Sequence, residues 1–181
     1  MTNNENKIVS KLKPKQLQFL IFLVIFIDLF ITIDQVSKYY VRTNFEYGES
    51  VVVIKDFFHF TYSQNQGAAF SMGDDYPIEV RRVLFLFIPV IAVLWLIYLM
   101  YKSIPLSFFK AFSYALIVSG AIGNLIDRFY LGYVVDFFHF FYRDYHFAIF
   151  NVADSLISVA AFLLILDLII EQIRAKKKLT T

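Results

Sequence analysis

Four long apolar runs constrain the fold of this 181-residue chain more than any other feature. A helix needs about 17 to 25 mostly apolar residues to cross the hydrocarbon core of a bilayer. The runs cover Leu17–Ile33, Val83–Met100, Phe108–Ile126 and Phe147–Ile170. Hydrophobic residues make up 59% of the chain, more than in a soluble globular domain. The sequence therefore predicts a membrane all-α fold, a four-transmembrane-helix bundle.

The basic residues predict the orientation of this bundle. They gather before the first run (Lys7, Lys11, Lys13, Lys15), around the connection between the second and third runs (Lys102, Lys110) and after the fourth (Arg174, Lys176, Lys177, Lys178). Because cytoplasmic segments carry an excess of Lys and Arg, we expect both termini and this connection in the cytoplasm. The basic tail is typical of binding to anionic lipids, not nucleic acid. Arg81 and Arg82 lie on the side expected to be external, and we assign them to snorkelling at the interface.

These patterns divide the chain into a cytoplasmic polar N-terminal arm (1–16), a four-helix membrane domain (17–171) and a basic cytoplasmic tail (172–181). The expected spans are 17–36, 83–101, 108–128 and 147–170, and the expected outer segments are 37–82 and 129–146. In the first outer segment, "SVVVIKDFFHFTY" is rich in β-branched and aromatic residues. It predicts a small antiparallel sheet on the outer membrane surface. The aromatic rings of the second outer segment are expected in the interfacial belt.

The polar residues of the apolar runs gather at one end of the predicted bundle. With the orientation above, Asp34, Asn124, Asp127, Arg128, Asn151 and Asp154 all fall near the outer membrane face, and Asn65 and Asp136 lie on the outer segments. Polar groups inside a membrane are costly unless they are paired or line a wet cavity, so they are functional candidates. The alternative is that they join helices through hydrogen bonds, with Gly120 and Gly123 allowing close approach. Both interpretations stay open.

Two carboxylates have the surroundings of a catalytic pair. Asp136 is flanked by Val and Phe residues, and Asp154 begins a membrane helix. Two aspartates brought together in such a setting share one proton, because ionising both is costly. One can then activate water as a general base while the other polarises a carbonyl and protonates the leaving amine. Arg128 would keep the adjacent Asp127 ionised, which suits an orienting role for that residue.

Other kinds of site have little support. The chain has no cysteine, which excludes disulfides and thiol catalysis. His59, His139 and His146 lack metal-binding spacing, so we expect no metal and no cofactor. Asp28 lies deep in the first span, where it is expected to pair inside the bundle, and Asp167 lies near the inner end of the fourth.

Five ordered motifs together resemble one known family. "DQVSK" begins at Asp34, "NQGAAFS" at Asn65, "SGAIGNLIDR" at Ser119, "VVDF" at Val134 and "FNVADS" at Phe150. In this order they are similar to the motifs of bacterial lipoprotein signal peptidase, also called signal peptidase II. The resemblance runs from about Asp34 to Ser158. Ser119, where the family often has glycine, is a small departure that affects local helix packing.

The resemblance implies a multi-pass aspartic endopeptidase of the bacterial inner membrane, with a small extracytoplasmic β-cradle and its active site near the outer leaflet. Such enzymes remove signal peptides from prolipoproteins, cutting before a diacylglyceryl-modified cysteine. By motif position, Asp136 and Asp154 are similar to the catalytic dyad. The implied substrate-binding or supporting positions are Asp34, Lys38, Asn65, Gly67, Ala68, Gly120, Asn124, Asp127, Arg128, Asn151 and Ala153. The implied partners are the lipidated precursors and membrane lipids, and we expect a monomer.

Two other functions remain to be weighed. A small proton-coupled transporter or channel subunit would use the carboxylates as a relay, which needs polar residues throughout the bilayer depth; only Asp28 lies deep. A lipid-binding or assembly protein would use the outer aromatic residues but leave the two aspartates without a role.

Overall fold

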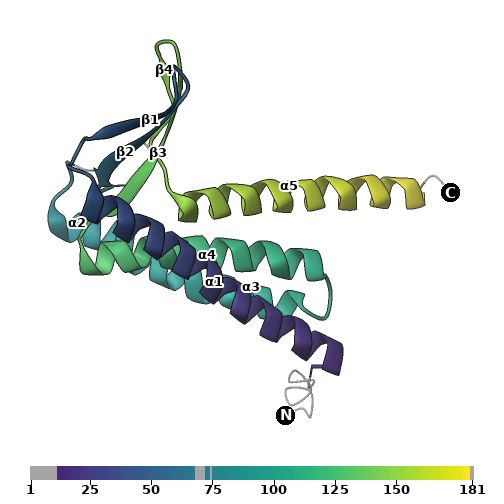
Figure 1. Cartoon of the computed structure of the whole chain (residues 1–181). Helices are drawn as coiled ribbons and strands as arrows, with labels where there is room; N and C mark the ends of the chain where they lie inside the picture. The colour runs from purple at the N-terminus through teal and green to yellow at the C-terminus, as the bar shows by residue number, and fades with distance from the viewer. Residues whose placement is uncertain (1–11, 68–71, 74, 180–181) are drawn as a thin grey trace.

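The computed structural model describes residues 12–67, 72–73 and 75–179 (Figure 1). Its elements are α1 (Pro14–Asn44), β1 (Ser50–Ile54), β2 (Phe58–Asn65), α2 (Ile78–Arg82), the π-helix η3 (Val83–Phe87), α3 (Ile88–Ser103), α4 (Phe108–Tyr130), β3 (Val134–Tyr142), β4 (Tyr145–His146) and α5 (Val152–Leu179). In the described part of the chain, four helical stretches are long and apolar enough to cross a membrane: α1, the continuous α2–η3–α3, α4 and α5. The predicted four-helix membrane fold is confirmed.

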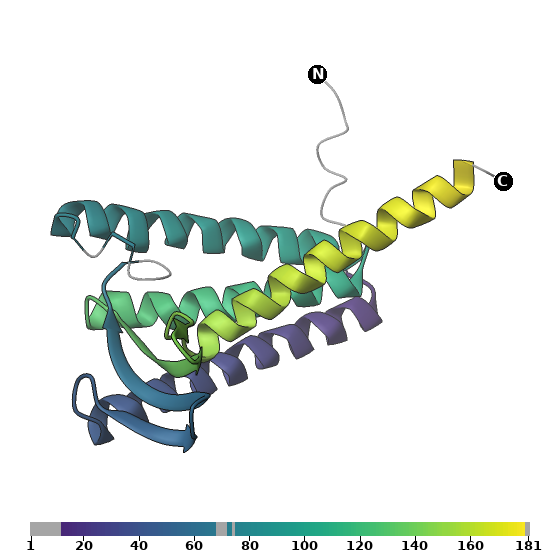
Figure 2. The ribbon, with the colours of Figure 1, turned by 90° about the horizontal axis from the view of Figure 1, so that it is seen from above.

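Helix α4 is the buried centre of the bundle. It packs against α1, α3 and α5, and seen from above it lies between α3 and α1 (Figure 2). Half of its most apolar window is buried, against 11% to 17% in the other three spanning stretches. Small residues such as Ala111, Ala115 and Gly120 let the neighbouring helices approach its buried face. The other helices expose large apolar side chains, as helices in contact with lipid do.

The outer segments fold into one four-stranded antiparallel sheet of order β1-β2-β3-β4, which stands at one end of the bundle (Figure 1). The small sheet predicted from residues 50–62 is confirmed. Strands β3 and β4 fall in the segment for which only an aromatic belt was expected. The first residues of β3, Val134 to Phe137, are all buried, so the polar alternation that marks a half-exposed strand is missing there.

Several helix ends differ from the expected bounds. Helix α1 continues to Asn44 instead of ending near residue 36, because no glycine or proline interrupts the chain before Gly48. The second spanning helix begins at Ile78, directly after Pro77, so that Arg81 and Arg82 belong to it.

Helix α5 begins at Val152, and the residues before it return to the sheet through the bridge between Phe138 and Phe150. It also continues to Leu179, so the basic tail extends the helix over most of its length.

Candidate active site

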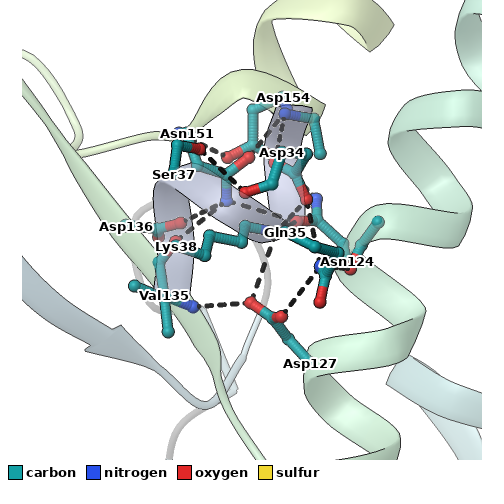
Figure 3. Close-up of polar contacts among 12 residues, drawn as sticks. Asp34, Gln35, Ser37, Lys38, Asn124, Asp127, Val135, Asp136, Asn151 and Asp154 are labelled. Carbon is teal, nitrogen blue, oxygen red and sulfur yellow. Dashed lines mark hydrogen bonds and ion pairs between the residues drawn. The ribbon is translucent and has the colours of Figure 1, made fainter. Parts of the chain in front are cut away.

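Polar side chains from five elements meet where the sheet joins the bundle. Figure 3 shows those from α1, α4, β3 and the start of α5. They come from the outer half of α1, the end of β2, the last turns of α4, the start of β3 and the first turn of α5. All of the spanning helices except α2–η3–α3 therefore contribute to this cluster. Most of its members are buried: Asp34, Lys38, Asn124, Asp127, Asp136 and Asn151.

Asp136 is held by two amide donors. Asn65 Nδ2 donates to Asp136 Oδ2 at 3.0 Å, and Asn151 Nδ2 donates to Oδ1 at 2.7 Å. Only 2% of the residue is exposed. Burial, followed by repulsion from the charge of Asp154, raises the pKa of Asp136 to about 7, although the two amides favour its charged form. Asp136 is thus poised to exchange a proton near neutral pH.

Asp154 is the third residue of α5, and it takes part in the cap of that helix. The backbone N–H of Asp154 donates to Asn151 Oδ1 at 3.0 Å, and the backbone N–H of Asn151 donates to Asp154 Oδ2 at 3.2 Å. This reciprocal arrangement is a capping box, which fixes both side chains at the helix start. A negative charge is also favoured there by the helix dipole.

Asn124 and Asn151 connect the two aspartates. Asn124 Nδ2 donates to Asp154 Oδ1 at 2.7 Å, while Asn124 Oδ1 accepts from Asn151 Nδ2 at 3.2 Å and from Lys38 Nζ at 2.8 Å. An ammonium group can only donate, so Lys38 fixes which end of the Asn124 amide points to Asp154. The path from Asp136 to Asp154 therefore runs through two oriented amides.

Lys38 also joins two buried carboxylates. Its Nζ lies 2.8 Å from Asp34 Oδ2 and 3.3 Å from Asp127 Oδ2. The other oxygen of Asp34 accepts the backbone N–H of Ala153 at 2.8 Å, and Asp127 Oδ2 accepts the backbone N–H of Val135 at 3.0 Å. This buried cluster ties α1 to α4, to β3 and to the start of α5.

Asp127 forms its ion pair with Lys38 of α1, and no hydrogen bond or ion pair among the described residues joins it to the adjacent Arg128. Residues next to each other on a helix point in different directions, which explains why the Arg128 side chain contacts other groups. Arg128 Nη2 donates to the backbone oxygen of Gly67 at 2.8 Å, and the Gly67 N–H donates to Asn65 Oδ1 at 3.0 Å. Ala68 lies outside the described residues.

Gly120 and Ala153 contribute through packing. A Cβ atom added at Gly120 would collide with the backbone oxygen of Ala153, and one added at Gly123 would lie 2.5 Å from Asp34 Oδ2. The close approach of α4 to α5 and to Asp34 thus needs glycine at both places. Both interpretations of the polar stripe on α4 therefore apply, since it joins helices and also reaches the cavity.

Gln35 was missed at the sequence level. Its Nε2 lies within hydrogen-bond distance of Asp34 Oδ2 (3.2 Å), the Gly123 backbone oxygen (3.0 Å) and Asp127 Oδ1 (3.1 Å). It stands next to Asp34 in "DQVSK", so its position in that motif was the available signal. Asp28, expected to pair inside the bundle, is exposed on α1 and has no hydrogen bond or ion pair among the residues described. Asp167 lies 3.5 Å from Lys110.

A cavity of about 570 Å³ opens beside the two aspartates. Its polar wall carries Asn65, Asn124, Arg128, Asp136 and Asp154, and its apolar wall is formed by residues 147–150 and the first turns of α5. Among the described residues, no three His, Asp or Glu side chains converge as around a metal ion. The cavity therefore sets two carboxyl groups on its polar wall beside room for an apolar substrate.

Comparisons with known proteins agree with this geometry. The family model described as signal peptidase (SPase) II matches residues 23–170. The chain is 42% identical to a lipoprotein signal peptidase of Clostridium tetani over 149 residues, which covers 82% of this chain and 92% of that protein. It is 48% identical to a lipoprotein signal peptidase of Shewanella sediminis over 139 residues, covering 74% and 75%. A solved bacterial membrane enzyme aligns with a TM-score of 0.74 and 31% identity, covering 83% of this chain and 89% of that one.

Proposed function

The chain belongs to the signal peptidase II family, proteases that remove signal peptides from prolipoproteins, and from this premise we propose that Asp136 and Asp154 are its catalytic pair. The observation that carries the proposal is the raised pKa of Asp136 beside a second carboxylate in a half-apolar cavity. A peptide bond is hydrolysed by such a pair when one acid is ionised and the other holds a proton.

In the proposed reaction, Asp154 takes a proton from water and Asp136 donates a hydrogen bond to the scissile carbonyl. Asp136 suits the acid role because burial raises its pKa to about 7, so that the carboxyl group can hold a proton near neutral pH. The water oxygen adds to the carbonyl carbon, and the carbonyl oxygen gains the proton of Asp136. The proton now on Asp154 then passes to the leaving amine as the C–N bond breaks. As the carbonyl re-forms, one hydroxyl of the tetrahedral intermediate returns its proton to Asp136, so Asp136 is again protonated and Asp154 is again ionised.

The other polar residues have supporting roles in this proposal. Asn65, Asn124 and Asn151 orient the two acids. Arg128 borders the cavity, where its guanidinium can donate to carbonyl oxygens of the substrate, and it also donates to the Gly67 backbone oxygen, which positions Gly67 beside the substrate. The buried cluster of Asp34, Lys38 and Asp127 holds the elements that carry these groups. Gly120 and Ala153 set the spacing of α4 and α5.

The substrate, the orientation and the oligomeric state complete the proposal. The apolar wall of the cavity fits a precursor whose cysteine carries a diacylglyceryl group, because such a cysteine stays at membrane depth. With basic residues at both ends of the chain, both termini lie in the cytoplasm and the acids near the outer leaflet. We further propose that the protein acts as a monomer among membrane lipids, because the two acids and the amides that orient them form a connected site without a residue from a second copy.

The experiment compares single amide variants on a lipidated precursor. Asp136→Asn and Asp154→Asn are each expected to lower the rate of cleavage at least about 100-fold, because an amide can neither accept nor release the required proton. Asp28→Asn is the matched control, since Asp28 lies on the exposed side of α1 away from the cavity. Its rate should stay within about threefold of the unchanged protein.

Turnover near normal in either active-site variant, with folding intact, would remove that residue from the pair. An unlipidated precursor is the control for the substrate, and equal cleavage of both precursors would contradict the lipid requirement. No observation favours a transporter. The polar cluster lies where the sheet joins the bundle, and Asp28 is exposed on α1.

A further inference from the structure

Three arginines line a second cavity that the proposed reaction does not use. It has a volume of about 500 Å³ and lies between the start of the second spanning helix and the end of α4. Arg81 and Arg82 come from α2, and Arg128 comes from α4. None of the described residues that line it is an aspartate or a glutamate. Its described lining therefore carries three guanidinium groups and no carboxylate.

The hydrogen-bonding capacity of these guanidinium groups is largely unused. Arg81 Nη1 donates to Gln66 Oε1, and Arg128 Nη2 donates to the Gly67 backbone oxygen. The Nε atoms of Arg81 and Arg128 are both buried without a partner, and Arg82 makes no hydrogen bond or ion pair within the described ranges. Each guanidinium offers five N–H donors. Buried donors of charged groups are rarely left unpaired, so these Nε atoms are suited to an anionic acceptor.

The lining and position of this cavity indicate which kind of anion it could bind. Apolar side chains such as Ile78, Phe85 and Phe129 share the lining with the arginines. The Arg128 guanidinium also lies over the ring of Phe85, with its Cζ atom 5.8 Å from the ring centre. The site lies at the end of the bundle that carries the sheet (Figure 1). An anion with apolar groups attached fits this combination better than a fully hydrated one.

We propose that Arg81 and Arg82, with Arg128, bind the phosphate of a membrane phospholipid. A phosphate offers several acceptor oxygens that match the fork of an arginine, and a phosphodiester adds the negative charge that the cavity lacks. The glycerol and the first acyl carbons would lie on the apolar wall. This inference explains why two arginines occur at the membrane end where few are expected. Arg128 borders both cavities, so a bound lipid would adjoin the active site.

The test measures lipid binding directly, so its failure is distinct from failure of the proposed protease activity. The full-length protein in neutral detergent is titrated with phosphatidylglycerol, and bound lipid is counted by native mass spectrometry. The variant is Arg81→Gln combined with Arg82→Gln. The matched control combines Lys55→Gln with Arg143→Gln, which removes two positive charges from exposed turns of the sheet. Diacylglycerol of the same chain length tests the need for phosphate, and glycerol 3-phosphate tests the need for the lipid chains.

We expect the arginine variant to weaken phosphatidylglycerol binding about tenfold or more, and the control to change it less than about twofold. Diacylglycerol can also enter the substrate cavity, so its binding should be the same in all three proteins. Equal phosphatidylglycerol binding by the arginine variant and the control would overturn the inference, and so would an equal loss of diacylglycerol binding in the arginine variant. Glycerol 3-phosphate bound as tightly as the lipid, and lost with the arginines, would replace the lipid with a soluble phosphate.

Arg82→Gln alone and Arg81→Lys guard against a folding defect. Arg82 is exposed and its side chain has no hydrogen-bond or ion-pair partner in the described part of the chain, so this variant should fold normally and still bind phosphatidylglycerol several-fold more weakly. Arg81→Lys keeps the charge but loses the fork, so its binding should fall between that of the unchanged protein and that of the double variant. Unchanged binding in both single variants, with normal folding, would again contradict the site.

Discussion

Asp136 has neighbours that act on its charged form in opposite directions. Burial and the charge of Asp154 raise its pKa, while the amides of Asn65 and Asn151 lower it. Because the proposed reaction needs the proton on Asp136, activity should fall as the pH rises through about 7. The apparent pKa of this decrease, the falling limb of the pH profile, is a property of the coupled pair of aspartates and not of one residue alone.

Asn65→Ala should move this limb to higher pH. The variant removes a hydrogen bond that favours the ionised form, so Asp136 holds its proton longer. The expected displacement is about one pH unit, the size of one charge-assisted hydrogen bond. It is measured as kcat/KM against pH. Gln64→Ala is the control on the same strand, since Gln64 bonds to the Tyr62 hydroxyl instead. A limb that stays in place or moves to lower pH would contradict the assigned role of Asn65.

Lys38 has a structural role that can be separated from catalysis. Lys38→Met leaves Asp34 and Asp127 buried with no cation, which should lower the free energy of unfolding by about 3 to 5 kcal/mol. Adding Asp34→Asn should recover part of this loss, because one of the two unpaired charges is removed. Thermal unfolding in detergent measures both variants. No recovery in the double variant would mean that Lys38 acts through Asn124 alone.

The spanning helices were predictable because hydrophobic length alone defines them, while their ends depend on local contacts. The start of α5 is set by the cap between Asn151 and Asp154, and the preceding residues pair with β3. Hydropathy carries no information about either contact, so the fourth span was expected to begin at residue 147, five residues before α5 begins at Val152. Strand β3 escaped prediction for a related reason, since its first residues are buried on both faces.

The sheet links all three histidines of the chain across its strands. Ser50 bridges His59 and Thr61, Thr61 Oγ1 lies 3.2 Å from His139 Nδ1, and His139 Nε2 lies 3.1 Å from His146 Nδ1. Burial, followed by the neighbouring His146 and His59, lowers the pKa of His139 below its usual 6.5. The folded sheet thus favours the neutral ring.

The sheet should therefore weaken in acid. A group with a lowered folded pKa contributes stability that is present above its unfolded pKa and is lost as the pH falls below it. Between pH 7 and pH 5, hydrogen exchange at the amides of β3 should accelerate, while α4 stays protected. His139→Gln should reduce this pH dependence. The same acceleration in β3 and α4 would point to global loss of structure instead.

The absence of cysteine makes the orientation of the whole molecule testable. Asp144→Cys lies in an exposed turn of the sheet, and Gln172→Cys lies near the far end of α5. If both termini are cytoplasmic, an impermeant maleimide added to intact cells should label only the first. Both should react after the cells are broken. Labelling of Gln172→Cys alone in intact cells would reverse the orientation.

The candidate site was predictable in its members more than in its connections. Aspartates and asparagines in apolar segments are easy to recognise in a sequence, because polar groups inside a membrane are costly and therefore rare unless they are paired or functional. Their partners depend on which helices meet, and Lys38 reaches Asp127 only because α1 packs on α4. Resemblance to a family supplied the pairing of Asp136 with Asp154, which lie on different elements. Asp28 was expected to pair inside the bundle because it lies deep in its span, but its side chain is exposed on α1.

The capping box at the start of α5 includes Asp154, so the same hydrogen bonds that begin the helix also hold one of the two acids in place. Terminal turns of helices fray more readily than the helix interior. Fraying here would release Asp154 and Asn151 together, and Asn151 is also the donor that holds Asp136. On heating, the enzyme should therefore be inactivated reversibly while its bundle is still intact, and its activity would recover as that first turn re-formed on cooling.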